Sequence, residues 1–203
     1  MLALARQLQT HPAFSDFLTE SCIHALFKCA PLHDIGKVGI PDRVLLKPGQ
    51  FDAEEWRIMQ QHPLLGYEAL QRANVEANTR SGFLDVAKDI VLSHHEKWDG
   101  TGYPQGLQGE SIPMAARLMA VADVYDALIS RRIYKDAMPH AQAVSILLRG
   151  RSSHFDPDVI DAFERIQDEF HAIAQQYADS DLELENKAQS LGVQVSGHGP
   201  LTA

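Results

Sequence analysis

Several features common in proteins are scarce in this chain of 203 residues, and each scarcity excludes a class of protein. There are only two cysteines, Cys22 and Cys29, seven residues apart in an apolar helical pattern, so we expect both to face a core and not to form a disulfide or thiolate site. A basic surplus is also lacking. Acidic residues outnumber basic ones by 27 to 18 and the net charge is −9, which argues against duplex DNA as a partner.

Long apolar runs are missing as well. No stretch reaches membrane-spanning length, and the first residues have no signal-peptide pattern, so we expect no membrane span and a cytoplasmic location. No segment shows the strict alternation of a strand. The predicted fold class is therefore all-α, with one multi-helix domain over residues 1–178 and a polar, partly disordered tail over 179–203.

Apolar residues at helical spacing predict most of the secondary structure. They indicate helices over residues 1–9, 14–30, 64–70, 83–95, 113–129, 139–149 and 157–177. Asp52 and Glu55 form a capping-box pattern that opens another helix, and Pro63 suits the first turn of the helix after it. Residues 72–82 are polar and predict a loop. Residues 98–113 are rich in glycine and proline, which is typical of a surface loop whose backbone comes close to something.

The chain has an unusually high number of histidines, ten, and some of them occur with aspartates at the ends of predicted helices. The central pair is His33-Asp34, because an imidazole and a two-oxygen carboxylate from one short segment can hold two metal ions bridged by Asp34. Lys37 lies three residues later and can reach the same side, and Gly36 keeps bulk away from the space between them. The remaining candidate ligands are His62, His94, His95 and Asp123.

Each candidate has an ordinary structural explanation when taken alone. His62 could be a helix-start histidine, and the pair His94-His95 could end a helix, where positive charge is favoured. Asp123 is stronger evidence, because it directly follows the apolar run Leu118–Ala122, where a bare carboxylate is costly to bury. Only the joint pattern favours a metal centre. Imidazole with carboxylate suits Fe, Mn, Zn, Ni or Co better than Mg or Ca, and such a centre fits phosphate ester or diester hydrolysis.

Longer motifs add a resemblance to a known family. The chain contains His33-Asp34-Ile35-Gly36-Lys37, Gln61-His62-Pro63, His94-His95-Glu96-Lys97-Trp98-Asp99-Gly100-Thr101-Gly102-Tyr103-Pro104, Ala122-Asp123-Val124-Tyr125-Asp126-Ala127-Leu128 and Phe155-Asp156-Pro157. Over residues 4–177 it resembles the HD-GYP family of bacterial cyclic di-GMP phosphodiesterases, within the HD metal-hydrolase superfamily. The resemblance implies a single HD-type domain and hydrolysis of cyclic di-GMP to pGpG and in some members GMP, in second-messenger signalling.

The resemblance also implies roles for residues of this chain. His33, Asp34, His62, His94, His95 and Asp123 would be ligands of two divalent metals, Fe or Mn first, with Asp34 bridging and catalytic. Lys37 would contact the scissile phosphate and help to protonate or orient the leaving group. Substrate-binding positions would be Arg132 and Lys135, which suit phosphates, together with Gly102, Tyr103 and Asp126. An alternative for Arg132 and Lys135 is a solvated basic turn.

Further expectations concern what lies beyond this chain. Family members usually begin with a helix that carries another histidine ligand, and some hold a third metal there. By this resemblance the chain is an N-terminally truncated HD-GYP domain that lacks its first ligand-bearing helix, and residues 1–10 contain no histidine or glutamate. We therefore expect the site of His33 and Asp123 to keep fewer protein ligands than the site of Asp34, His62 and His94, and the activity to be reduced. The family also suggests a receiver domain of a two-component response regulator, a diguanylate-cyclase-type (GGDEF) partner at the Gly-Tyr-Pro loop, and a homodimer.

Two other functions stay open at this stage. One is a non-catalytic module that binds a cyclic dinucleotide or a protein partner. The other is an HD hydrolase of a different cyclic dinucleotide, because one sequence does not place the groups that select the base. The Gly102-Tyr103-Pro104 string argues against a nucleoside triphosphate substrate.

Overall fold

The computed structural model describes residues 1–77, 82–130 and 138–177, with side chains except for 74–77, and these residues form helices without a named strand. The helices in chain order are α1 (Leu2–Leu8), α2 (Glu20–Cys29), η1 (Ala30–Leu32), η2 (Ile35–Gly39), α3 (Asp42–Leu45), α4 (Ala53–Met59), α5 (His62–Ala77), α6 (Gly82–Ser93), η3 (Gly109–Ser111), α7 (Met114–Ile129), α8 (His140–Arg149), α9 (Pro157–Arg165) and α10 (Gln167–Gln176). The predicted all-α class is confirmed. In the described part of the chain, no helix combines the length and the apolar character needed to cross a membrane.

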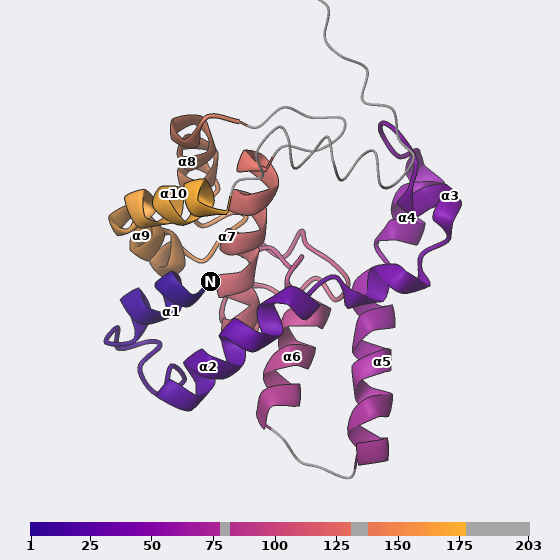
Figure 1. The fold of residues 1–203 in the computed structure, drawn as a ribbon, viewed down its shortest axis with the longest axis horizontal. Coiled ribbons are helices and arrows are strands. Elements are labelled where there is room, and N and C mark those ends of the chain that lie inside the picture. The colour runs from indigo at the N-terminus through magenta and orange to yellow at the C-terminus, as the bar shows by residue number, and fades with distance from the viewer. Residues whose placement is uncertain (78–81, 131–137, 178–203) are drawn as a thin grey trace, which may run out of the picture.

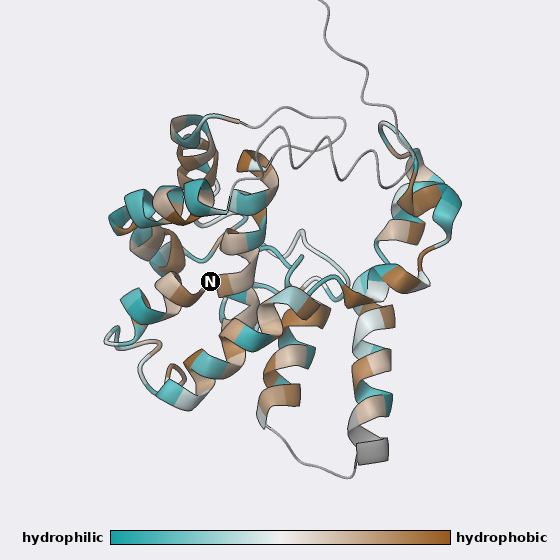
Figure 2. Cartoon of the chain, viewed as in Figure 1, coloured by the Kyte–Doolittle hydropathy of each residue, from teal (hydrophilic) through white to brown (hydrophobic). Residues whose placement is uncertain are grey.

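Helix α6 lies at the middle of the packing. It contacts α2, α5 and α7, and its residues Ala87, Ile90 and Val91 are fully buried. Figure 1 shows α5 and α6 side by side, with α1, α8, α9 and α10 grouped on the other side of α7. Most helices carry both apolar and polar residues (Figure 2), as expected for elements that bury one side. The last turns of α6 are therefore held by the main core, which fixes the backbone just before His94.

A second, smaller core supports the other side of the site. Ile40, Val44 and Met59 form it, with Leu45, Phe51, Ile58 and Leu65 packed against them. It joins α3 and α4 to the start of α5. Helix α4 opens with the expected capping box: Asp52 accepts hydrogen bonds from the N–H groups of Glu54 and Glu55, and Glu55 accepts one from the N–H of Asp52.

Local signals placed most helix starts correctly and some helix extents wrongly. Asp156 caps α9 with Pro157 in its first turn, and Pro63 lies in the first turn of α5, as predicted. The polar stretch 72–82 is not all loop, because α5 continues to Ala77. Helix α5 packs on α6, and this packing outweighs the weak helix propensity of the polar residues at the end of α5.

Two predicted helices differ from the structure. Residues 14–30 do not form one helix, because Thr19 has extended backbone angles and its side chain accepts the N–H of Cys22, so α2 begins at Glu20. Residues 157–177 are broken at Ile166 (φ −118°, ψ 16°) into α9 and α10. Apolar spacing continues through both breaks, since Phe14, Leu18 and Phe170 are still buried in the main core.

The two cysteines are free and pack in or against the main core, as predicted. Cys29 is fully buried, and its thiol donates to the carbonyl of Phe83 at 3.4 Å. Burial raises the pKa of the Cys29 thiol to about 11, which makes it a poor nucleophile. The predicted tail over 179–203 lies outside the described residues.

Candidate metal centre

Asp34 lies where η1 and η2 meet, and its two carboxylate oxygens face different groups. Oδ2 lies 3.2 Å from Nε2 of His33 and accepts a hydrogen bond from Nζ of Lys37 at 2.6 Å. Oδ1 lies 3.4 Å from Nε2 of His62 and 3.9 Å from Nε2 of His94. One carboxylate thus joins two groups of possible ligands, and Lys37 reaches the same side of the chain as predicted.

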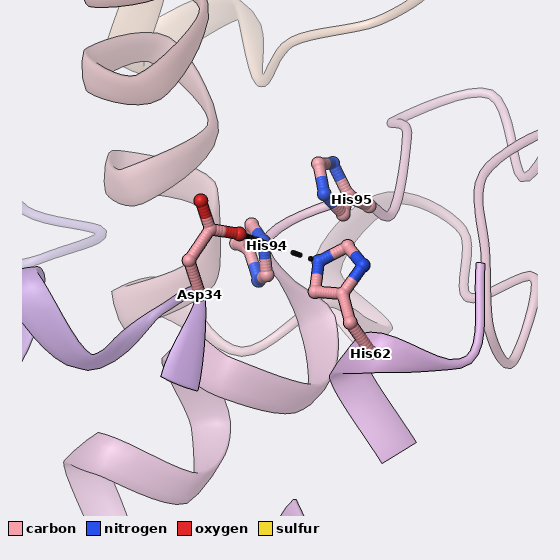
Figure 3. Close-up of side chains that lie close together, drawn as sticks. All are labelled: Asp34, His62, His94 and His95. Carbon is pink, nitrogen blue, oxygen red and sulfur yellow. Dashed lines mark ion pairs between the residues drawn. The ribbon is translucent and has the colours of Figure 1, made fainter. Parts of the chain in front are cut away.

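Four of the expected ligands form a compact set. Asp34, His62, His94 and His95 each offer one ligand atom, and these atoms all lie within 4.8 Å of one another. Figure 3 shows their side chains converging from three separate segments: the η1–η2 junction, the start of α5 and the segment just after α6. The set is compatible with binding a divalent metal ion.

His33 and Asp123 extend this set on the other side of Asp34. Nε2 of His33 lies 3.5 Å from Oδ1 of Asp123, which projects from the middle of α7. The ring of His33 also meets the ring of His94 edge-on, with centroids 5.2 Å apart. All six residues expected as ligands therefore lie at one place, although they are spread over 91 positions of sequence between His33 and Asp123.

Hydrogen bonds to backbone carbonyls orient three of the imidazoles. Nδ1 of His33 lies 2.8 Å from the carbonyl of Ala30, Nδ1 of His62 lies 2.7 Å from that of Met59, and Nδ1 of His94 lies 2.9 Å from that of Ile90. A carbonyl only accepts, so each Nδ1 must carry the proton and donate. In His62 and His94 the other nitrogen, Nε2, therefore presents its lone pair to the centre in a neutral ring, which is the usual state of a metal-bound histidine. In His33, Nε2 instead lies near the carboxylates of Asp34 and Asp123.

Within the described part of the chain, these two lone pairs have no partner. Nε2 of His62 and Nε2 of His94 are buried and make no hydrogen bond with any described residue, although both face Oδ1 of Asp34. A lone pair that faces a carboxylate oxygen is unfavourable unless a cation lies between them, and buried polar atoms are nearly always satisfied. A divalent metal ion would satisfy all three atoms at once, so the residues present fit this group.

The pKa shifts of the buried histidines favour the neutral, ligating form. Burial lowers the pKa of His62, and burial followed by the charge of His33 lowers the pKa of His94 to about 4. Burial and the neighbouring histidines lower the pKa of His95 to about 3. These three rings therefore stay neutral at neutral pH and do not have to lose a proton before binding a metal.

The charge balance differs around His33. Burial opposes its charged form, but hydrogen bonds to Asp123 and Asp34 outweigh burial and raise the pKa of His33 to about 10. The same contacts lower the pKa values of both carboxyls against the opposing effect of burial, and Lys37 adds to the shift at Asp34. Two carboxylates thus hold a positive charge at this position, which is the charge that a metal ion would supply instead.

Gly36 allows two backbone segments to approach each other closely. A Cβ atom built on Gly36 would lie 1.9 Å from the carbonyl oxygen of His62 and 2.5 Å from the backbone nitrogen of Gly66. The glycine therefore lets η2 lie directly on the first turns of α5, and this contact sets the distance between Asp34 and His62.

The glycine-rich loop packs against the cluster. The ring of Tyr103 stacks on the ring of His95, with centroids 4.8 Å apart and an angle of 26° between planes. Burial, followed by the charges of Asp34 and Asp123, raises the pKa of the Tyr103 phenol above its ordinary value, so the phenol is neutral. The edge of Trp56 meets Tyr103 at a centroid distance of 6.0 Å. Gly102 lies next to Tyr103 with its backbone against Glu96.

The other predicted substrate-binding residues are Asp126, Arg132 and Lys135. Asp126 is exposed on α7, and its carboxylate accepts a hydrogen bond from the hydroxyl of Ser130 at 3.2 Å. Arg132 and Lys135 lie outside the described residues. The roles of all these residues stay predictions.

Sequence reasoning missed Trp56 and Glu96 as neighbours of the site. Trp56 follows a helix cap and looks like any amphipathic helix residue, so no local signal distinguishes it. The sequence does contain a signal for Glu96, since this carboxylate directly follows two candidate ligands inside the longest motif.

Comparison with known proteins agrees with this geometry. The family model of the HD domain matches residues 5–159. A probable cyclic di-GMP phosphodiesterase of Vibrio cholerae serotype O1 is 52% identical over 194 residues, which are 96% of this chain and 44% of that protein. A cyclic di-GMP phosphodiesterase of the same organism is 54% identical over 178 residues, which are 88% of this chain and 36% of that protein. The chain thus spans less than half the length of these relatives.

A solved structure shares the fold. The crystal structure of a cyclic GMP-AMP specific phosphodiesterase of V. cholerae (V-cGAP3) aligns with a TM-score of 0.52 at 18% identity, over 93% of this chain and 49% of that one. At this identity the match supports the helical architecture alone. Together with the relatives, the HD match confirms the HD-GYP resemblance that the motifs indicated.

Proposed function

The chain belongs to the HD domain family, and from this premise we propose that it is a metal-dependent phosphodiesterase that hydrolyses cyclic di-GMP to pGpG and further to GMP. The names of the two Vibrio cholerae relatives suggest the substrate. The observation that carries the proposal is the arrangement around Asp34: Oδ1 faces the imidazoles of His62 and His94, and Oδ2 faces that of His33. Among the described residues, Nε2 of His62 and Nε2 of His94 have no hydrogen-bond partner.

In the proposed site, Asp34 bridges two divalent ions. His62, His94 and His95 complete one position, and His33 with Asp123 serves the other. We propose iron or manganese, with zinc, nickel or cobalt as alternatives, because mixed imidazole and carboxylate ligands suit these ions. When bound, such ions supply Lewis-acid activation of phosphate oxygens and of water.

The surrounding residues would handle the substrate. Nζ of Lys37 lies 2.6 Å from Oδ2 of Asp34, so its positive charge is close enough to contact the scissile phosphate and assist the leaving oxygen. Tyr103 would form a wall beside the base or ribose, with Gly102 allowing the close approach of the loop. Asp126, Arg132 and Lys135 complete the proposed contacts, the last two with phosphates.

We also propose three partners for the enzyme. A GGDEF protein would dock at the Gly-Tyr-Pro loop, a receiver domain would regulate the enzyme in longer relatives, and two chains would pair. A cytoplasmic location is part of the same proposal. Each of these points stays a prediction from the sequence.

The test is turnover by the metal-loaded chain. Protein purified anaerobically with Mn²⁺ or Fe²⁺ should convert cyclic di-GMP to pGpG and GMP. Chromatography measures the products, and a parallel assay with cyclic GMP-AMP compares the two substrates. Asp34→Ala should abolish turnover and lower metal content. Asp85→Ala is the matched control, because Asp85 is exposed on α6 and pairs only with Lys88 at 2.9 Å among the described residues.

Each other outcome has a clear meaning. Turnover that persists in Asp34→Ala would refute the metal mechanism. Binding of cyclic di-GMP without hydrolysis in either metal would favour the non-catalytic module. Faster hydrolysis of cyclic GMP-AMP than of cyclic di-GMP would reassign the substrate.

A further inference from the structure

Glu96 is a buried carboxylate with no place in the metal centre. Its side chain belongs to a residue that is only 2% exposed. Oε1 accepts the backbone N–H of Gln105 at 2.7 Å, and Oε2 accepts the backbone N–H of Leu107 at 3.0 Å. Burying a carboxylate is costly unless donors compensate, and hydrogen bonds to a charged acceptor are strong. Both of its oxygens are thus committed to the glycine-rich loop.

The loop also contacts the backbone on either side of Glu96. A Cβ atom on Gly102 would lie 2.5 Å from Cα of Glu96 and 2.3 Å from the backbone nitrogen of Lys97, so only glycine fits there. The N–H of Tyr103 donates to the carbonyl of His95 at 3.2 Å. Residues 102–107 are therefore fastened to the segment 95–97 by backbone contacts and by one carboxylate.

This fastening fixes an aromatic ring at the metal centre. Tyr103 stacks on His95, which belongs to the compact set of possible ligands. If the loop moved away from Glu96, the Tyr103 ring would leave the face of His95, while His33, His62 and His94 kept their hydrogen bonds to backbone carbonyls. The loop and these three candidate ligands are thus held by different contacts, so their effects can be separated by mutation.

The far end of the loop has its own anchor. Arg117 donates to the carbonyl of Ile112 at 2.6 Å and to that of Glu110 at 2.7 Å, and its guanidinium lies 5.5 Å from the centroid of the Trp98 ring. Residues 109–113 therefore stay attached when the contacts of Glu96 are lost. A change at Glu96 should loosen the part around Tyr103 and leave the fold intact.

We propose that Glu96 is a positioning residue that holds loop residues 102–107, and through them Tyr103, as a preformed wall of the metal centre. The inference rests on the proposed function, because this wall is the surface that a cyclic dinucleotide would meet there. A preformed wall lowers the cost of ordering on binding, so its loss should raise KM more than it lowers kcat.

The main test is Glu96→Gln in the full chain loaded with Mn²⁺. Glutamine keeps the shape, but its NH₂ group cannot accept, so one loop N–H loses its partner. The amides of Gln105 and Leu107 should exchange with solvent about 10- to 100-fold faster. KM for cyclic di-GMP should rise about tenfold, with a smaller change in kcat and unchanged Mn²⁺ content.

Asp99→Asn is the matched control. Asp99 lies in the same loop, but it is exposed and its carboxylate accepts only the N–H and hydroxyl of Thr101 among the described residues. Its replacement should leave KM and the exchange of Gln105 and Leu107 within about twofold of the original.

Two further variants keep the test decisive. Gly102→Ala should push the loop off the backbone of Glu96 and raise KM in the same way, even if Glu96→Gln fails to fold. In the background of Tyr103→Ala, Glu96→Gln should add little to KM, because neighbours that act through one group are not additive. Full additivity would overturn a role through Tyr103.

A melting temperature that falls in Glu96→Gln while KM stays unchanged would also overturn the inference, since Glu96 would then be only structural. Failure of the proposed function looks different. In that case no variant hydrolyses cyclic di-GMP, yet the amides of Gln105 and Leu107 still exchange faster in Glu96→Gln than in Asp99→Asn, which supports the anchoring by Glu96.

Discussion

Replacing Gly36 by alanine should damage the metal centre without touching a ligand. The added Cβ would lie 1.9 Å from the carbonyl oxygen of His62 and 2.9 Å from the carbonyl carbon of the same residue. Both atoms belong to the backbone in the first turn of α5, so no side chain can rotate to make room. The η2 segment must move away from α5.

The size of this movement follows from the contact distance. Atoms as close as 1.9 Å must separate to at least 3.0 Å, so the η2 backbone moves by about 1 Å relative to α5. Asp34 directly precedes η2, and its Oδ1 is 3.4 Å from Nε2 of His62. Overpacking of this kind costs about 1–3 kcal/mol, and a misplacement of about 1 Å at a catalytic group costs about 100-fold in rate.

Three measurements test Gly36→Ala. The thermal midpoint should fall by several degrees, since about 1 kcal/mol corresponds to about 2–4 °C for a chain of this size. Metal content after purification should fall, and turnover of cyclic di-GMP should drop about 100-fold. The control is Gly39→Ala in the same segment, where the three atoms nearest to the new Cβ belong to the side chain of Leu65, the first of them at 3.0 Å. Equal stability and metal content in the two variants would refute the reasoning.

Three further predictions test other parts of the structure. Arg117→Ala should lower the free energy of unfolding in urea by about 3–5 kcal/mol, because it leaves the buried carboxylate of Asp156, 3.2 Å from Arg117, without its cation. A loss smaller than that of an average surface substitution would contradict this. Chelating the metal should lower the free energy of unfolding by about 2.7 kcal/mol if the free ion stood at about 100 times its Kd, and Asp34→Ala should show no such metal dependence. In metal-free protein the raised pKa of His33, about 10 against an ordinary 6.5, stabilises the fold below pH 6.5, and this contribution is lost as pH rises toward 10. Urea unfolding across that range should show the loss, and His33→Gln should flatten it.

The sequence by itself determined the helical class and pointed to the six candidate ligands that the structure brings together. Helical spacing of apolar residues is a local signal, and so are the caps at Asp52 and Asp156, which explains why the starts of α4 and α9 were predicted correctly. The choice of imidazole and carboxylate ligands follows from side-chain chemistry, and the motifs made the HD family recognisable. The start of α2 after Thr19, the end of α5 at Ala77 and the break at Ile166 were missed. Tertiary packing decides how far a weak local pattern extends.

Only the tertiary structure decided how the ligands are arranged and what supports them. Which oxygen of Asp34 faces which imidazole depends on how η2 sits on α5, and that depends on the backbone contact at Gly36. The anchoring of the Tyr103 loop by Glu96 joins residues that the sequence lists as mere neighbours in one motif. The physical reason is that such contacts are set by distances between backbones, which sequence spacing does not encode.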